Sequence, residues 1–278
     1  MNYFERAKIY RAKKRLGQNF LTDANVIYDI IDAADILPED TVVEIGAGLG
    51  FVTEQLVKIA KKVVAIELDE DMVRELKKIP AENLQIVHAD ILKTDLSQFG
   101  DNIKIVANIP YYITSPIVAH LLGEVDDLNN QNRNSIDKIV MMTQYEAAKR
   151  ITANENSEEK AYGLLTILAQ FYSDVEMIRF VGSKSFFPAP QVNSAVIRFD
   201  VRKKPLLTLS DYSFFKKVAK ACFGTRRKNI KNSLTIAGFS KDAVQKTLSD
   251  LNISETIRGE ILSIQQIGEL AEKLKENL

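Results

Sequence analysis

Cysteine, histidine and long apolar runs are scarce in this sequence, and each scarcity excludes a class of protein. The single cysteine, Cys222, rules out an intrachain disulfide and a cysteine-rich metal site, and it suits a reducing cytosol. The two histidines, His88 and His120, lie far apart in the sequence, which argues against a zinc site. No apolar run reaches the length of about 18 residues that a membrane-spanning helix needs. We therefore predict no metal and no membrane association.

An excess of charge of either sign is also absent, since 37 basic residues balance 37 acidic ones. The charges are unevenly placed, however. Residues 6–15 contain six Lys or Arg and no acidic residue, and residues 216–231 contain seven and none. Such patches favour contacts with nucleic-acid phosphates, and the alternative is that both are solvated helix faces. The N-terminus lacks the apolar core of a signal peptide, but its basic character leaves a short organelle-targeting segment as a further alternative.

Strand-like and helix-like patterns alternate through the first half of the chain. Strands are predicted at 41–45, 63–67, 84–90, 103–108 and 136–144, and helices at 22–36, 51–62, 69–79 and about 115–122. This alternation predicts an α/β fold with a mostly parallel, doubly wound sheet.

The later part of the chain changes pattern twice. Residues 175–181 and 194–201 are β-rich with no long helix between them, which predicts an antiparallel pair at the sheet edge. From Tyr212 onward the pattern is helical and predicts a small helical domain, with helix breaks at Gly224, Gly238 and Gly259. We place the domain boundary between 1–204, which starts with a basic N-terminal arm, and 205–278. We expect the polar segment 123–137 to be a long surface loop.

Three glycines, Gly46, Gly48 and Gly50, stand between a predicted strand and a predicted helix. A loop of this kind lets backbone approach a ligand closely at a helix N-terminus. The dinucleotide fingerprint would need another glycine at position 51, which is Phe51. The spacing better fits a loop that cradles the amino-acid end of S-adenosylmethionine. A tight turn without a ligand is the alternative.

Carboxylates end the next two predicted strands. Glu67, about twenty residues after the glycine loop, is placed to accept both hydroxyls of a ribose, and Asp90 to accept the exocyclic amine of an adenine. Both would lie at the carboxyl edge of the sheet, where open α/β sheets bind ligands. Carboxylates at strand ends also serve as helix caps, which is the alternative for each.

The fourth strand ends in the unusual run Asn108, Ile109, Pro110, Tyr111. If the methyl acceptor is an exocyclic adenine amine, two carbonyl oxygens directed at its hydrogens would localise the nitrogen lone pair. The Asn108 side chain and a backbone carbonyl beside Pro110 are candidates for these acceptors. Tyr111 is the candidate for stacking on the base. The alternative is a strand-terminating turn with core tyrosines.

Seven segments, taken in order, resemble the bacterial type of the ribosomal RNA small subunit adenine N6,N6-dimethyltransferase family, and the resemblance spans essentially the full length. The segments are "RLGQNFLTD" (15–23), "EIGAGLGFVT" (44–53), "AIELD" (65–69), "HADIL" (88–92), "NIPYYITSPI" (108–117), "FFPAPQVNSAVIRF" (186–199) and "CFGTRRKNIKNSL" (222–234). The resemblance implies a Rossmann-like class I S-adenosylmethionine-dependent methyltransferase sheet with a small C-terminal all-helical domain.

Further site residues follow from the resemblance. The family segment that matches "GQNFL" folds over the cofactor, so Asn19 and Leu21 are implied to contact S-adenosylmethionine together with the glycine loop, Glu67, Asp90 and Asn108. A simple N-terminal cap on the core is the alternative for residues 18–20. Phe187 matches the aromatic residue that faces the tyrosine across the target base, whereas Phe186 is expected in the core.

The resemblance also implies the substrate and the partners. Members of the family dimethylate two adjacent adenines in a hairpin loop near the 3′ end of small-subunit ribosomal RNA, within an immature 30S-type subunit. We expect a cytoplasmic, metal-free monomer. The residues expected to contact RNA are Arg11, Lys13, Lys14, Arg226, Arg227, Lys228 and Lys231.

Two departures from the family pattern, Tyr145 in place of a lysine and Leu164 in place of a small or basic residue, bear on RNA orientation. Two other functions stay open. One is an assembly factor that binds immature subunits with a vestigial site, and the other is a DNA adenine methyltransferase.

Overall fold

The computed structural model describes residues 2–157, 161–225 and 227–278, which form two compact units. The first unit comprises Met1–Leu122, Asn129–Lys149 and Ser173–Lys203, and the second comprises Gly123–Leu128, Arg150–Tyr172 and Lys204–Leu278. The last division lies close to the expected boundary. Two earlier segments join the second unit because their apolar side chains, including Val125 and Tyr172, pack into its helical core.

Seven strands in the described part of the first unit form one sheet in the order β4-β3-β2-β5-β6-β9-β7. Their bounds are β2 Thr41–Ile45, β3 Lys62–Glu67, β4 Leu84–His88, β5 Ile103–Asn108, β6 Ile136–Gln144, β7 Ser173–Val181 and β9 Ser194–Val201. Strands β4, β3, β2, β5 and β6 pair in parallel, and β9 is antiparallel to both β6 and β7. The predicted mostly parallel sheet with an antiparallel pair at its edge is confirmed.

The strand order reverses between β2 and β5. From β2 the chain moves outward on one side to β3 and β4, and it then returns to the other side for β5 and β6. Ile45 lies beside Ala107 across the two central strands. In an open α/β sheet, the carboxyl ends of strands at such a reversal leave a crevice in which ligands bind.

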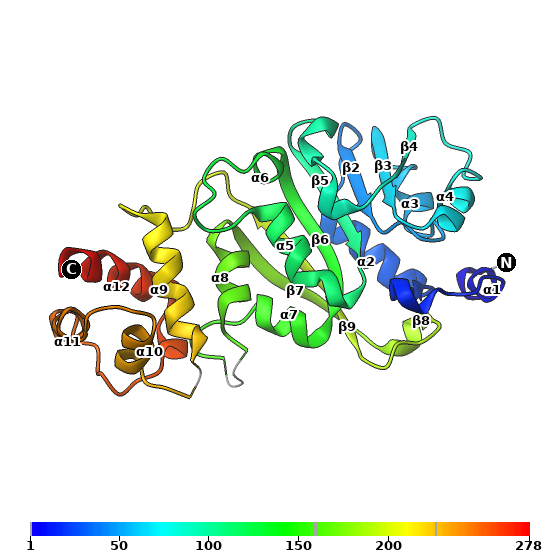
Figure 1. Cartoon of the computed structure of the whole chain (residues 1–278). Helices are drawn as coiled ribbons and strands as arrows, with labels where there is room; N and C mark the ends of the chain where they lie inside the picture. Colours follow the sequence, from blue (N-terminus) through cyan, green and yellow to red (C-terminus); the bar gives the residue numbers. More distant parts are fainter. Residues whose placement is uncertain (1, 158–160, 226) are drawn as a thin grey trace. The chain divides into compact units, whose positions relative to one another are not determined.

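Helices cover both faces of this sheet. Their bounds in the first unit are α2 Ala24–Ala34, α3 Thr53–Leu56, α4 Glu70–Leu76, α5 Thr114–Leu122 and α6 Gln131–Ser135, while α7 Tyr145–Ile151 crosses into the second unit. The Asp23 carboxylate caps α2 by accepting from Asn25 N–H. Apolar residues of α2 pack on the sheet through Val26, Ile27 and Ile30. Figure 1 shows α2 behind the sheet and α5 in front of it.

A short N-terminal helix, α1 (Tyr3–Lys8), anchors the basic segment that the sequence predicted as an arm. Tyr3 stacks on Phe51 with ring centroids 4.7 Å apart, and Arg6 makes a two-pronged contact with Glu54 at 2.5 and 2.9 Å. Downstream, β1 (Phe20–Leu21) pairs antiparallel with β8 (Phe186–Phe187). The arm is therefore packed on the first unit rather than projecting from it.

The expectation of a surface loop over 123–137 is wrong for its second half, which forms α6 and the start of β6. Two polar side chains there are buried, Asn132 at 9% and Arg133 at 1% exposure. The Asn132 side chain accepts from Leu96 N–H at 2.8 Å and donates to the carbonyl of His120 at 3.0 Å. Within this asparagine-rich stretch, Asn132 is therefore buried and satisfies backbone groups, which a composition argument does not detect.

The second unit is built from helices. They are α8 Leu164–Phe171, α9 Tyr212–Gly224, α10 Ile230–Ile236, α11 Lys241–Asp250 and α12 Ile264–Glu276, with a 3₁₀ turn at Gly259–Ile261. The expected helix breaks at Gly224, Gly238 and Gly259 are confirmed. Phe171, Phe215 and Val218 lie in the core of this unit with no measurable exposure. Among the described helices none is both long and apolar enough to cross a membrane.

Candidate active site

A pocket lies at the carboxyl edge of the sheet, at the reversal between β2 and β5. The space inside it is about 1150 Å³, counted out to its open mouth and including solvent there. The residues that line it include eight predicted site residues: Asn19, Leu21, Gly46, Gly48, Glu67, Asp90, Asn108 and Pro110. The structure therefore brings together, from five separate stretches of chain, most of the residues assigned to cofactor and catalysis.

The glycine turn and Asn108 are in direct contact. Gly46 follows β2 with a φ of +74°, and a Cβ at this position would lie 2.7 Å from the carbonyl oxygen of Asn108. Only glycine combines this left-handed conformation with so close an approach. The start of the loop and the end of β5 are thereby held side by side.

Glu67 ends β3 with both carboxylate oxygens fixed by backbone donors. Oε2 accepts from Gly48 N–H and Oε1 from Asp69 N–H, both at 2.8 Å. Burial raises the pKa of the Glu67 carboxyl, and the hydrogen bonds from Asp69 and Gly48 offset part of that rise. Each oxygen has further acceptor capacity, which a ribose hydroxyl could use.

Asp90 lies half-buried just after β4. Its Oδ1 accepts from Leu92 N–H at 3.0 Å and so caps the 3₁₀ turn Ile91–Lys93. The cap interpretation therefore holds for Asp90, and it does not remove Asp90 from the pocket, which the same residue lines. The second oxygen has no partner among the described residues of the chain.

Residues 16–21 lie along one wall of the pocket. A Cβ at Gly17 would lie 3.2 Å from Pro110 Cβ and 3.4 Å from the ring of Tyr112, and a Cβ at Gly48 would lie 3.5 Å from the ring of Phe20. Asn19 donates from Nδ2 to the carbonyl of Gly17 at 3.1 Å. The segment contacts both the glycine turn and the turn that follows Asn108.

Two predicted site residues lie elsewhere. Gly50 is not among the described lining residues, and a Cβ there would lie 2.7 Å from Ile79 Cδ1, so this glycine serves close packing beside α4. Phe187 packs edge-on against Phe4 with centroids 5.5 Å apart, whereas its neighbour Phe186 lines the pocket and is buried. The side chain of Tyr111 is outside the described residues.

The residues predicted to contact RNA differ in whether their side chains are exposed or already paired with carboxylates. Arg11, Arg227 and Lys228 are exposed. Arg226 and the side chain of Lys14 lie outside the described residues.

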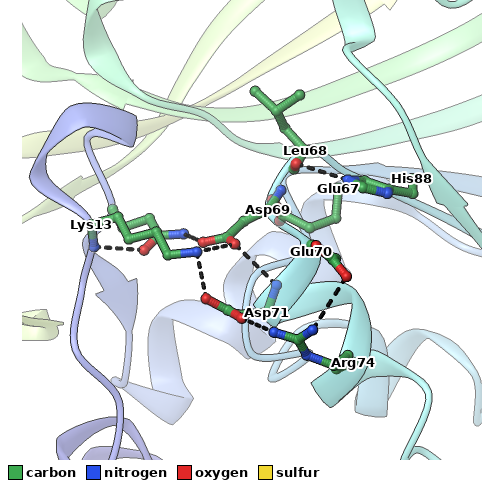
Figure 2. Close-up of polar contacts among 9 residues, drawn as sticks. Lys13, Glu67, Leu68, Asp69, Glu70, Asp71, Arg74 and His88 are labelled. Carbon is green, nitrogen blue, oxygen red and sulfur yellow. Dashed lines mark hydrogen bonds and ion pairs between the residues drawn. The ribbon is translucent and has the colours of Figure 1, made fainter.

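Two others are already engaged in ion pairs. Lys231 Nζ lies 2.6 Å from Glu255 Oε2, and Lys13 Nζ lies 2.5 Å from both Asp69 Oδ1 and Asp71 Oδ2. Figure 2 shows Lys13 reaching the carboxylates of Asp69 and Asp71 at the start of α4. A phosphate would compete with these carboxylates for either lysine.

Glu44, for which the sequence predicted no site role, also lines the pocket. It is 3% exposed on β2, and Thr53 Oγ1 donates to its Oε2 at 2.5 Å. Burial, aided by the charge of Glu67, raises the pKa of Glu44 to about 8. Its place inside an apolar strand, "TVVEI", is the one sequence signal that marks it.

This buried carboxyl makes stability depend on pH. In the unfolded chain Glu44 ionises near its ordinary pKa of 4.5, while in the folded chain it stays protonated up to about 8. The folded state thus binds the extra proton, and stability falls as pH rises through this window, by up to about 1.4 kcal/mol per pH unit. Glu44→Gln, which keeps an acceptor for Thr53, is expected to flatten this fall in urea denaturation between pH 5 and 8. The exposed Glu39→Gln serves as control, and parallel curves for wild type and Glu44→Gln would contradict the assignment.

Asp69 is the other residue that sequence reasoning missed. It follows β3 by two residues and receives contacts from both Lys13 and Gln18. Its position before the acidic helix α4 identifies it only as a cap, a role it also fills by accepting from Asp71 N–H at 3.0 Å. Among the described residues, no cluster of three or more His, Cys, Asp or Glu side chains could hold a metal ion.

The comparisons with known proteins agree with the motifs. The model of the ribosomal RNA adenine dimethylase family matches residues 9–276. Ribosomal RNA small subunit methyltransferase A of Clostridium botulinum is 39% identical over 268 residues, which cover 95% of this chain and 94% of that protein. The protein of the same name from Bacillus licheniformis is 40% identical over 279 residues, covering 96% of this chain and 92% of its own.

Solved structures show the same fold. A dimethyladenosine transferase from Plasmodium falciparum superposes with a TM-score of 0.78 at 27% identity, covering 93% of this chain and 98% of that one. The 23S rRNA methyltransferase ErmE superposes with a TM-score of 0.69 at 27% identity, covering 92% and 100%. The predicted fold class and the predicted resemblance are both confirmed, and this chain belongs to the ribosomal RNA adenine dimethylase family.

Proposed function

We propose that this chain transfers methyl groups from S-adenosylmethionine to the N6 amines of two adjacent adenines in the 3′-terminal hairpin loop of small-subunit ribosomal RNA. Each amine would receive two methyl groups while the 30S-type subunit matures. The observation that carries the proposal is the meeting of the glycine turn with Asn108 in one pocket that Glu67 and Asp90 also line. Membership in the ribosomal RNA adenine dimethylase family supports the class of reaction.

The residues present fit S-adenosylmethionine, whose sulfonium would supply the methyl group. Gly46 and Gly48 line the pocket without side chains, and this part of the turn would take the amino-acid end. Glu67, oriented by two backbone donors, would accept the ribose hydroxyls, and Asp90 would accept the adenine amine. Asn19 and Leu21 would close the pocket from the N-terminal side.

The acceptor amine would be held by oxygen atoms. The Asn108 side-chain oxygen is one acceptor for its hydrogens. The backbone carbonyl of Ile109, directly before Pro110, would be the second, while Pro110 O accepts from Ile113 N–H at 3.2 Å. Two such acceptors favour a pyramidal nitrogen with a localised lone pair. The described lining of the pocket contains no His or Cys, and this mechanism needs neither as a base.

Aromatic residues would hold the target base in plane. Tyr111 keeps the proposed stacking role from its place directly after Pro110. On the opposite side, the sequence match favours Phe187, while the lining of the pocket favours Phe186. Loop adenines are partly unstacked already, which lowers the cost of moving one into a pocket.

RNA outside the target loop would be bound through phosphates. Arg11, Arg227 and Lys228 are exposed and so available for this role. We propose that residues 205–278 hold the RNA, that one copy of the chain suffices, and that the reaction takes place in the cytoplasm. The single cysteine, buried as Cys222, agrees with a reducing compartment.

The test uses purified full-length protein with methyl-labelled S-adenosylmethionine. Small subunits that lack the adenine methylation are expected to accept label. Mass spectrometry of RNA fragments from these subunits should detect N6,N6-dimethyladenosine at two adjacent positions. Fully methylated subunits and duplex DNA carrying adenine serve as controls. Binding to subunits without transfer would favour the assembly-factor function, and transfer to DNA alone would favour the DNA methyltransferase.

A further inference from the structure

Lys13 and Gln18 contact both carboxylate oxygens of one residue, Asp69. Lys13 Nζ lies 2.5 Å from Oδ1, and Gln18 Nε2 donates to Oδ2 at 2.7 Å. Gln18 Oε1 in turn accepts from the backbone N–H of Lys13 at 2.8 Å, which closes residues 13–18 into a loop. Lys13 Nζ also lies 2.5 Å from Asp71 Oδ2, and Figure 2 shows this ion pair. The loop is thus tied as a unit to the N-terminus of α4.

This contact differs from an ordinary surface ion pair. The Asp69 side chain is only 2% exposed and that of Lys13 32%. Burial alone would raise the pKa of Asp69, but the bonds from Lys13, Gln18 and Asp71 N–H outweigh it and hold the pKa below its usual range. A buried carboxylate that loses its cation is costly, whereas an exposed pair contributes little. Breaking the contact between Lys13 and Asp69 would therefore cost free energy.

The other side of Asp69 leads to the pocket. Its backbone N–H donates to Glu67 Oε1, and the second oxygen of Glu67 accepts from Gly48 N–H, both at 2.8 Å. The anchor of the loop and the carboxylate proposed for the ribose are therefore one hydrogen bond apart.

The tied loop is also part of the pocket wall. Leu16, Gly17 and Asn19 line the pocket. Gly17 lies against Pro110 and Tyr112. This wall thus contacts the turn after β5 through Gly17, while Lys13 and Gln18 fix it to the start of α4.

We propose that Lys13, Gln18 and Asp69 form a latch that holds residues 13–19 across the pocket and slows the release of S-adenosylmethionine and of its product, S-adenosylhomocysteine. Asp69 is then a positioning residue rather than a catalytic one. This inference rests on the proposed function, because it requires the pocket to hold that ligand. It also reassigns Lys13 from RNA contact to cofactor retention.

The experiment compares Lys13→Met with Lys13→Arg and with Arg15→Met, a change at an exposed basic residue of the same segment. Hydrogen exchange of the amides of residues 13–19 is measured without ligand, and the dissociation rate of S-adenosylhomocysteine by stopped flow. Lys13→Met is expected to speed both by about tenfold, which corresponds to about 1.4 kcal/mol. Lys13→Arg should restore most of the wild-type behaviour because arginine also pairs with carboxylates, and Arg15→Met should match wild type.

A double-mutant cycle with Asp69→Asn identifies the partner. If the latch operates through Asp69, Lys13→Met should add little to the dissociation rate of Asp69→Asn. A wild-type dissociation rate in Lys13→Met, or additive effects of the two changes, would overturn the latch while leaving the proposed function intact. Failure of the wild type to bind S-adenosylhomocysteine would overturn both. Urea denaturation of each variant reports any general loss of folding.

Discussion

Asn108→Ala is expected to lower the rate of methyl transfer by about a hundred- to a thousandfold. The side-chain oxygen of Asn108 is the proposed acceptor for one amine hydrogen, and removing one preorganised polar group that acts on the reacting atoms commonly costs this much. The backbone of Asn108 stays in place because its carbonyl packs on the glycine turn, where a Cβ at Gly46 would lie 2.7 Å away. The change therefore removes the acceptor without removing the wall behind it.

The measurement is single-turnover transfer to small subunits that lack the methylation, with subunit binding followed separately. Binding is expected to stay close to the wild-type value, because phosphate contacts lie elsewhere. Asn108→Asp, which keeps acceptor oxygens at the same place, should retain more activity than Asn108→Ala. Asn134→Ala, at an exposed asparagine of α6, is the matched control. A wild-type rate for Asn108→Ala would contradict the proposed contact between Asn108 and the amine.

The position of the site was predictable because polar residues that end parallel strands share one edge. Gly46, Glu67, Asp90 and Asn108 each follow or end a recognisable β-branched run, so their chain order alone places them together. The structure adds the reversal between β2 and β5, which sets Gly46 directly against Asn108. Sequence patterns of this kind therefore predict which strand ends lie together.

Side-chain partners were not predictable in the same way. Lys13 belongs to a run of basic residues, and its pairing with Asp69 depends on where the N-terminal segment packs.

Neighbouring aromatic residues pose a similar difficulty. In the two-residue strand β8, a shift of one position decides whether Phe186 or Phe187 faces the pocket, and so short a strand has no alternation to show the register.

Buried polar groups were missed for a related reason. Arg133 and Asn132 read as loop residues by composition, yet both satisfy backbone groups in the interior. Glu44 reads as a strand residue, and only its tertiary surroundings show that burial raises the pKa of its carboxyl. A carboxylate at a strand end is visible in a sequence, whereas the number of donors that surround it is not.

Glu67→Ala is expected to weaken the binding of S-adenosylmethionine by more than about tenfold. The loss has two parts. The ribose hydroxyls would lose their proposed acceptor, and Gly48 N–H and Asp69 N–H would lose the oxygens that now fix the glycine turn and the start of α4. Titration calorimetry with the ligand gives the affinity directly, and an unaltered dissociation constant would refute the assignment.

Glu67→Gln makes the sharper test of the same geometry. Glutamine keeps a single acceptor oxygen, so its amide nitrogen must point at the N–H of either Gly48 or Asp69, and one bond is replaced by a contact between two donors. The change is nearly isosteric, yet we expect it to cost almost as much affinity as Glu67→Ala. Glu70→Gln, at a carboxylate three residues along whose side chain is 70% exposed, should bind the ligand like wild type. If Glu67→Gln also bound like wild type, the two backbone donors could not be orienting this carboxylate for a ribose.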